Sequence, residues 1–531
     1  MCHFSLDITG HKVAVKRKGR LTSNDSIKLP MAIGMFSNTL TELLIDCHPC
    51  DVSIPMLLDI LPSLTHLTVK FDDIDNNTLS NSEICSRYYQ NNNSRRKKNI
   101  AALSHTNLIF LCLDNALNFD TRILPILQRC PKIKFLLIAL DMDRTNVFDI
   151  PAKYIRNAFE LCPLIRYIAW NGDPEKDRVE EWLELSRKYD GRRRRQQQRQ
   201  HNITSSNNRR SIKYHEDDDP IDKEEPGTVR KIVFACNTSQ DMNHLVPIMI
   251  KSRLWLEHLY ISVVYDWFWD FLPSHHFPQL TTLELYGIAM SSQQWVQLIS
   301  HHPQIEHLET EIYVDEMNGL DRIVEAMGTG LKNLRHLLLQ YERSNPFMPM
   351  TCITLGSMHN THIQHLHLAS VSISDQAFYD ICGLHHLEEL CIGAFDTYRE
   401  DMTEAGLLSG VKRWIGGYTQ EEIGQDGSKK VTRMKSKIRF IQLTAIQSVT
   451  DSVLESLGQV ESLMTLRITY NESITDDGPR AFGNNNNNSN NDNTNNSNMS
   501  RDDNDGNRKK LEMYACYGIS RRNPFVTRLP D

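Results

Sequence analysis

The chain has 531 residues, enough for about three domains of the usual 100 to 200 residues unless a repeat array takes their place. Lys and Arg number 59 and Asp and Glu 66, which gives a formal net charge of −7. This charge excludes a protein that binds nucleic acid over its whole surface. No stretch approaches the roughly 18 apolar residues of a membrane-spanning helix, and 12 cysteines in a chain of this length are too sparse for a disulfide scaffold. We therefore expect a reduced protein in the cytoplasm and/or nucleus, without membrane association.

One short phrase recurs along the chain: an aliphatic residue, two variable positions, an aliphatic, one variable position and an aliphatic. The copies begin at Leu40, Leu64, Leu108, Ile133, Ile165, Val229, Leu256, Leu280, Ile305, Leu334, Ile363, Leu387, Ile438 and Leu463. Many neighbouring copies start about 25 residues apart, as in a leucine-rich repeat, and each phrase predicts a short strand followed by a returning helix. The sequence predicts an α/β leucine-rich-repeat solenoid, a curved horseshoe with parallel strands on the concave face and helices on the convex face.

Polar segments interrupt this array and follow it. Runs such as Arg192–Arg195 cannot bury enough apolar surface to offset the entropy of ordering the chain. In chain order we expect an N-terminal segment or cap at 1–39, a repeat domain at 40–483, inserts near 75–100, 190–227 and 400–437, a disordered Asn-rich segment at 484–508 and a C-terminal tail at 509–531.

Two kinds of phrase make the repeats more specific. Cys130-Pro131 and Cys162-Pro163 precede strand phrases, Thr450-Asp451 and Thr475-Asp476 follow them, and Asn471 occupies the ninth position of its repeat. These phrases resemble the cysteine-containing repeats of ribonuclease-inhibitor-like proteins. Thr followed by Asp also suits a helix N-terminus, so the local structure alone accounts for that pair.

The chain also resembles F-box/leucine-rich-repeat proteins, although no F-box is visible in residues 1–39. That resemblance implies a substrate-recognition subunit of an SCF-type ubiquitin ligase, with the SCF adaptor and cullin complex among its partners. The alternative is a regulatory or inhibitory scaffold of the same fold without a ubiquitin-ligase role. Both hypotheses require a protein partner on the concave face, and neither requires a nucleic acid.

Histidines are concentrated at one position of successive repeats. Counted from the first aliphatic, the third position holds His258, Thr282, His307, His336 and His365, and the fifth holds Tyr260, Glu284, Glu309, Leu338 and His367. Both positions should project from the exposed strand face, because strand side chains alternate between faces. We predict a partner-binding site made of His258, Tyr260, Glu284, His307, Glu309, His336, His365 and His367. The alternative is a solvated face whose histidines were spread by repeat duplication.

The same two positions are apolar in earlier repeats. They hold Phe110, Cys112, Phe135, Leu137, Tyr167 and Ala169. These positions would expose apolar surface unless something covers it, and a disordered insert or a protein partner could do so.

Catalytic motifs are missing from the sequence, so we expect no enzyme. Cys47 and Cys50 have the spacing of a redox dithiol, but they directly follow a predicted strand, and we interpret them as structural. His365 and His367 could share a metal ion, yet the sequence supplies no third ligand. We accordingly expect no metal and no cofactor.

Overall fold

The computed structural model describes residues 3–9, 12–18, 38–47, 54–71, 107–114, 123–139, 153–170, 182–188, 228–236, 239–266, 270–313, 319–342, 355–393, 402–423, 429–484, 509–514 and 527–528. They belong to two compact units, Met1–Val264 and Tyr265–Asp531, and each unit is described by itself. The predicted inserts near 75–100 and 190–227, nearly all of 484–508 and the side chains of Cys47 and Cys50 lie outside the described residues.

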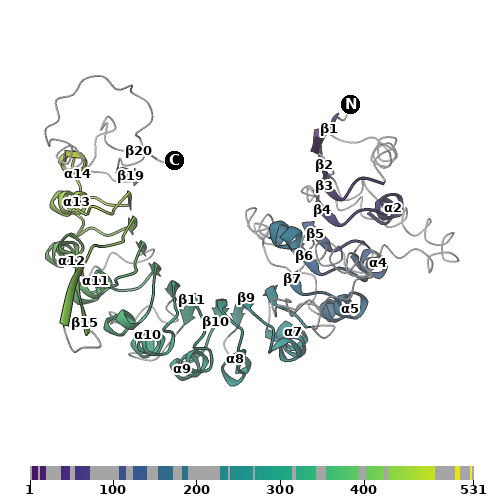
Figure 1. The fold of residues 1–531 in the computed structure, drawn as a ribbon, viewed down its shortest axis with the longest axis horizontal. Coiled ribbons are helices and arrows are strands. Elements are labelled where there is room, and N and C mark those ends of the chain that lie inside the picture. The colour runs from purple at the N-terminus through teal and green to yellow at the C-terminus, as the bar shows by residue number, and fades with distance from the viewer. Residues whose placement is uncertain are drawn as a thin grey trace, which may run out of the picture. The chain divides into compact units, whose positions relative to one another are not determined.

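The first unit is built on one sheet whose repeat strands are all parallel. Its strands are β1 (His3–Thr9), β2 (Lys12–Lys18), β3 (Glu42–Cys47), β4 (His66–Phe71), β5 (Phe110–Asp114), β6 (Phe135–Ala139), β7 (Tyr167–Trp170), β8 (Lys231–Cys236) and β9 (His258–Asp266). β1 and β2 form an antiparallel hairpin, and each strand from β3 to β9 pairs in parallel with its predecessor. Helices α2 (Ile54–Ile60), α4 (Leu124–Arg129), α5 (Lys153–Leu161) and α7 (Ser239–Ser252) lie on the same side of these strands (Figure 1).

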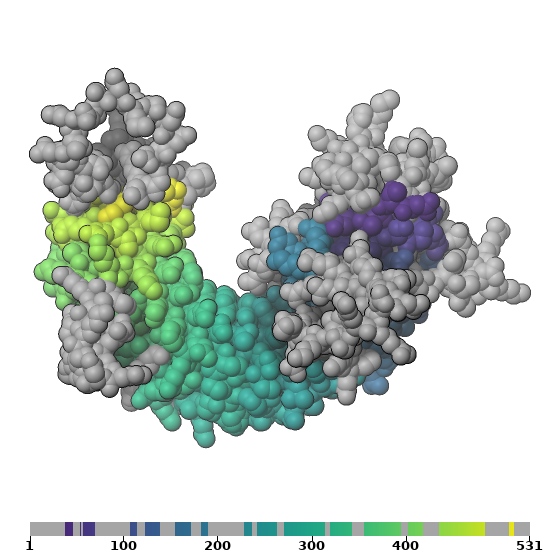
Figure 2. All heavy atoms as spheres, viewed as in Figure 1, coloured from purple at the N-terminus to yellow at the C-terminus, as the bar shows by residue number. Residues whose placement is uncertain are grey.

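The second unit continues the same alternation. Its parallel strands are β10 (Thr282–Ile288), β11 (His307–Tyr313), β12 (His336–Glu342), β13 (His365–Ala369), β14 (Glu389–Gly393), β17 (Phe440–Thr444), β18 (Thr465–Thr469), β19 (Lys510–Tyr514) and β20 (Thr527–Arg528). The returning segments are α8 (Phe271–Ser274), α9 (Ser292–His301), α10 (Gly319–Gly330), η5 (Gly356–Asn360), α11 (Asp375–Ile381), α12 (Glu404–Gly416), α13 (Asp451–Gly458) and α14 (Asp477–Asn484). The repeats of this unit are stacked in chain order in the space-filling view (Figure 2).

Described elements also occur in the segments predicted to flank or interrupt the array. The hairpin β1–β2 lies within residues 1–39, and β19 and β20 lie within 509–531. Helix α12 and a separate hairpin of β15 (Tyr418–Ile423) and β16 (Lys429–Met434) fall in the insert near 400–437. Strand pairing therefore extends past both ends of 40–483, whereas the predicted division into domains stays a prediction.

The repeat phrase is the structural unit of both compact units. In β11, side chains alternate between buried and half-buried, with Leu308 and Ile312 in the interior. Helix α9 begins at a capping box in which Ser291 accepts from the backbone of Gln294, and it buries Trp295 between strand and helix layers. The parallel strands and returning helices confirm the predicted leucine-rich-repeat solenoid.

Aspartates at the start of the return helices connect neighbouring repeats through hydrogen bonds, which the sequence did not indicate. The backbone N–H of Thr403 donates to Asp375 Oδ1 at 2.7 Å, and its hydroxyl donates to Asp375 Oδ2 at 2.8 Å. Thr475 makes the same two bonds to Asp451, one repeat earlier. Each aspartate thus binds the threonine that begins the next return segment, so the motif fixes the spacing between repeats as well as the start of a helix.

The side chain of Asn471 forms hydrogen bonds within its own repeat and to the preceding repeat. Its Nδ2 donates to the carbonyls of Ile446 at 2.6 Å and Val449 at 3.1 Å, while its Oδ1 accepts from the backbone of Ser473 and Ile474. The side chain is fully buried. It therefore satisfies turn groups that would otherwise be buried without partners.

Candidate functional site

The predicted histidine column is aligned by the parallel register of the second unit. Thr282 pairs with His307, His307 with His336, and His336 with His365. The fifth positions form the adjacent column, in which Glu309 pairs with Leu338 and Leu338 with His367. These side chains lie on the strand face opposite the buried leucines.

Glu309 joins two of the histidines into one cluster. Its Oε1 lies 2.8 Å from His307 Nε2 and 3.2 Å from His336 Nε2. The two imidazole rings are stacked with centroids 4.0 Å apart and planes 5° apart. The second carboxylate oxygen, Oε2, accepts from the Tyr286 hydroxyl at 2.7 Å. The cluster is therefore ordered by its own contacts before any partner arrives.

Glu309 is held in its charged form. Burial by itself would raise the pKa of this carboxyl, but the donors of His307, His336 and Tyr286 outweigh burial and hold the pKa of Glu309 well below its usual range. A carboxylate between two imidazoles favours cationic or hydrogen-bond-donating groups at this point of the face.

A second cluster adjoins the first on β13 and β14. Glu389 Oε2 lies 2.9 Å from His365 Nδ1, and its Oε1 lies 3.6 Å from His367 Nε2. Burial lowers the pKa of His367, whereas Glu389 opposes that shift. The sequence prediction omitted Glu389 and its neighbour Cys391, although both continue the third and fifth positions by one repeat. Extending the count to the copy at Leu387 would have found them.

The remaining predicted site residues are placed differently. Glu284 is in register with Glu309 on the same face, but it is only 3% exposed, so the expectation of an accessible carboxylate there was wrong. His258 and Tyr260 lie on β9 in the first unit, in register with Lys231 and Val233 of β8. The structure thus brings together His307, Glu309, His336, His365 and His367.

The apolar strand face of the first unit is covered by a helical segment, residues 182–188. Trp182 and Leu183 are buried in one cluster with Ile109, Phe110, Cys112, Phe135, Leu137, Ala169 and Val233, and Tyr167 and Tyr260 pack against it. The Trp182 ring meets Tyr167 edge-on at 6.5 Å, and Lys231 Nζ lies 4.9 Å from its centroid. The cover is therefore a helical segment of the chain that precedes the predicted insert near 190–227, not that insert or a protein partner.

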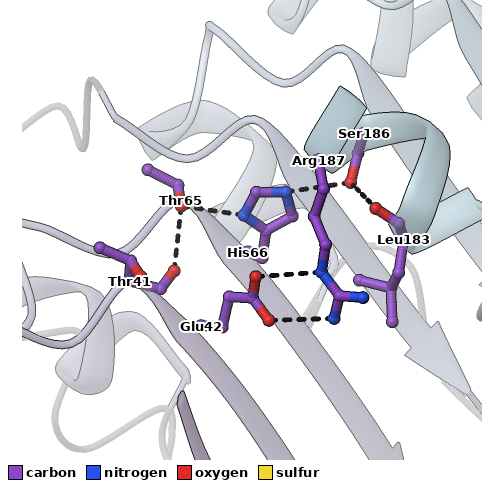
Figure 3. Close-up of polar contacts among 7 residues, drawn as sticks. All are labelled: Thr41, Glu42, Thr65, His66, Leu183, Ser186 and Arg187. Atoms are coloured by element: carbon purple, nitrogen blue, oxygen red, sulfur yellow. Dashed lines mark hydrogen bonds and ion pairs between the residues drawn. The ribbon is translucent and has the colours of Figure 1, made fainter. Parts of the chain in front are cut away.

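Polar contacts orient this segment at the edge of the apolar cluster (Figure 3). Arg187 donates to both carboxylate oxygens of Glu42, at 3.1 and 3.0 Å, and Ser186 Oγ contacts Nε2 of the buried His66 at 2.9 Å. Ser186 also donates to the Leu183 carbonyl at 2.8 Å. Because Glu42 and His66 belong to β3 and β4, residues 182–188 are fixed across strands far from them in sequence.

No family model matches the chain, and neither does any curated protein. Among solved structures, it is similar to a chain of the Toll–Spatzle complex, described as a molecular hub in Drosophila development and innate immunity. The identity is 12% and the TM-score 0.35, over 89% of this chain and 63% of that chain, so this chain spans less than two thirds of that chain's length. Among the described residues, no helix is both long and apolar enough to cross a membrane.

Proposed function

We propose that this solenoid is a protein-binding scaffold whose second unit receives a protein partner on the histidine face, defined as His307, Glu309, His336, His365, His367 and Glu389. The observation that carries the proposal is the set of His–Glu contacts on in-register parallel strands. Side chains ordered in advance lose little conformational entropy when a partner binds. A solenoid supplies a broad rigid surface for this purpose.

The histidine face also differs from the strand face of the first unit. There, Trp182 and Leu183 bury the strand face, whereas the described side chains of the histidine face are half-buried. Polar groups that combine imidazoles with carboxylates suit a partner offering both donors and acceptors. We therefore assign recognition to the second unit.

A triple variant tests this assignment. Changing His307→Ala, His336→Ala and Glu309→Lys should weaken partner binding by about tenfold or more, because it removes a preformed contact cluster and reverses its charge. The partner is first isolated by affinity capture with the full chain, and Kd is then measured with the purified protein. None of the three is a core aliphatic residue, so circular dichroism and the melting transition should show a folded protein.

A matched control changes the opposite, helical side of the same repeats. The control variant carries Gln297→Ala, Lys332→Ala and Glu325→Lys, all at exposed positions. Its Glu325→Lys substitution reverses the charge of a glutamate, as Glu309→Lys does in the triple variant. This control should bind the partner like the wild type. Equal Kd values for the triple variant and the wild type would contradict recognition through the histidine face.

The finer proposal is substrate recognition for an SCF-type ubiquitin ligase, in the cytoplasm and/or nucleus. It is supported by the resemblance of the chain to F-box/leucine-rich-repeat proteins. Binding of the full chain to a purified SCF adaptor and cullin complex, with loss of partner ubiquitination when the gene is deleted, is the expected result. Partner capture without adaptor binding would favour the regulatory or inhibitory scaffold instead.

A further inference from the structure

Three side chains on β11 and β12 bring metal-ligating atoms to one point. His307, Glu309 and His336 each offer one such atom, and these atoms all lie within 4.8 Å of one another. Both imidazole Nε2 atoms face the same carboxylate oxygen, at 2.8 and 3.2 Å. Ligands of a tetrahedral zinc ion with bonds of 2.0 to 2.1 Å are about 3.3 Å apart, so small side-chain movements would admit the ion.

Two features of the cluster indicate a ligand rather than a closed hydrogen-bond network. His336 Nε2 is buried, and at 3.2 Å it shares Glu309 Oε1 with His307 Nε2, which lies closer to that oxygen at 2.8 Å. Tyr286 binds the outer oxygen of Glu309 and leaves Oε1 directed at the two imidazoles. Ligating carboxylates in metal sites are commonly oriented by such a hydrogen bond.

From this geometry we infer that His307, Glu309 and His336 form a binding site for a divalent transition-metal ion, with Zn²⁺ as the best match. Two imidazole nitrogens and one carboxylate oxygen are ligands that Zn²⁺ accepts, and three protein ligands leave a fourth position for water or for a side chain of a partner. The inference concerns metal binding alone and does not depend on the proposed partner.

The neighbouring triad His367, Glu389 and Cys391 competes for the same ion. Burial and then Glu389 raise the pKa of Cys391 to about 12, although Arg467 opposes them. Its thiol would have to lose a proton to ligate, whereas the first triad needs only neutral imidazoles and an ionised carboxylate. Glu389 is also engaged by His365. The first triad is therefore the preferred site.

Zinc titration of the full chain tests the site. After treatment with a chelator, the protein is titrated with Zn²⁺ against a chromophoric competitor, and the bound metal is counted by elemental analysis. His307→Ala, His336→Ala and Glu309→Gln should each weaken Zn²⁺ binding at least about tenfold, because each removes one of three ligands. Wild-type affinity in all three variants, with folding confirmed by circular dichroism, would overturn the inference.

Controls separate this site from adventitious binding by other histidines. His362 and His386 form a ring pair with centroids 5.2 Å apart, and the variant His362→Ala/His386→Ala should retain full affinity, as should Cys391→Ser. Co²⁺ provides a second readout, since a thiolate ligand adds a charge-transfer band that imidazole and carboxylate ligands do not. Its absence supports the inference, whereas a band that disappears in Cys391→Ser would place the metal at the second triad and overturn it.

Discussion

The double variant Trp182→Ala/Leu183→Ala is expected to release residues 182–188 from the first unit and lower its free energy of unfolding by roughly 3 to 5 kcal/mol. Both side chains are buried against strand residues that include Phe110 and Phe135. Their loss leaves an aromatic face exposed to water. Urea denaturation measures the stability, and fluorescence of the dye ANS, which binds exposed apolar surface, reports the opened face.

The same helix supplies a matched control. Glu184 and Leu185 are exposed, so Glu184→Ala/Leu185→Ala places two alanines in the same helix without opening the cluster. The ion pair of Glu184 with Lys188 is also exposed, and surface pairs of this kind contribute little. This control should change the stability by about 0.5 kcal/mol or less. Equal losses of unfolding free energy in the two variants, without ANS binding in Trp182→Ala/Leu183→Ala, would show that residues 182–188 do not cover the apolar strand face.

Acidification is expected to destabilise the second unit through His302. This side chain is fully buried, its Nδ1 lies 2.8 Å from the Leu298 carbonyl, and its Nε2 accepts from the backbone of Phe277 at 3.2 Å. A nitrogen that accepts a backbone N–H must carry no proton, so the folded unit holds the neutral imidazole. Burial lowers the pKa of His302 to about 4, from an ordinary value of 6.5, with His276 and His301 acting in the same direction and the Leu298 carbonyl opposing.

The pKa of His302 is lower in the folded unit than in the unfolded chain, so acid favours the unfolded chain. Between pH 6.5 and about 4 the unfolded chain binds a proton that the folded unit does not, so stability falls as the pH is lowered through this range. This pKa difference corresponds to a loss of about 3 kcal/mol in the free energy of unfolding at the acid end of the range. Denaturation at a series of pH values should show a shallower acid slope for His302→Gln than for the wild type.

An exposed histidine provides the comparison for that experiment. His362→Gln removes an imidazole from the surface of the same unit and should leave the acid slope nearly unchanged. The slope, rather than the stability at one pH, is the relevant quantity, because His302→Gln also perturbs packing. An unchanged slope in His302→Gln would show that this side chain is protonated in the folded unit.

The sequence by itself determined the repeat, its strands and the histidine column. Strand side chains alternate between two faces, so a repeated aliphatic phrase specifies which positions are buried and which project outward. Constant register between parallel neighbours then aligns His307, His336 and His365. Local periodicity carries this information, and no knowledge of distant contacts is needed to find it.

Only the tertiary structure decided what those faces contact. Residues 182–188 cover Phe110 and Phe135 because Arg187 and Ser186 reach Glu42 and His66, partners more than a hundred residues away in sequence. The burial of Glu284 was likewise not evident from its repeat position. The convergence of His307 and His336 on one oxygen of Glu309 depends on side-chain rotamers and on the Tyr286 hydroxyl. Such contacts depend on packing in three dimensions, which a pattern of residue types along the chain does not specify.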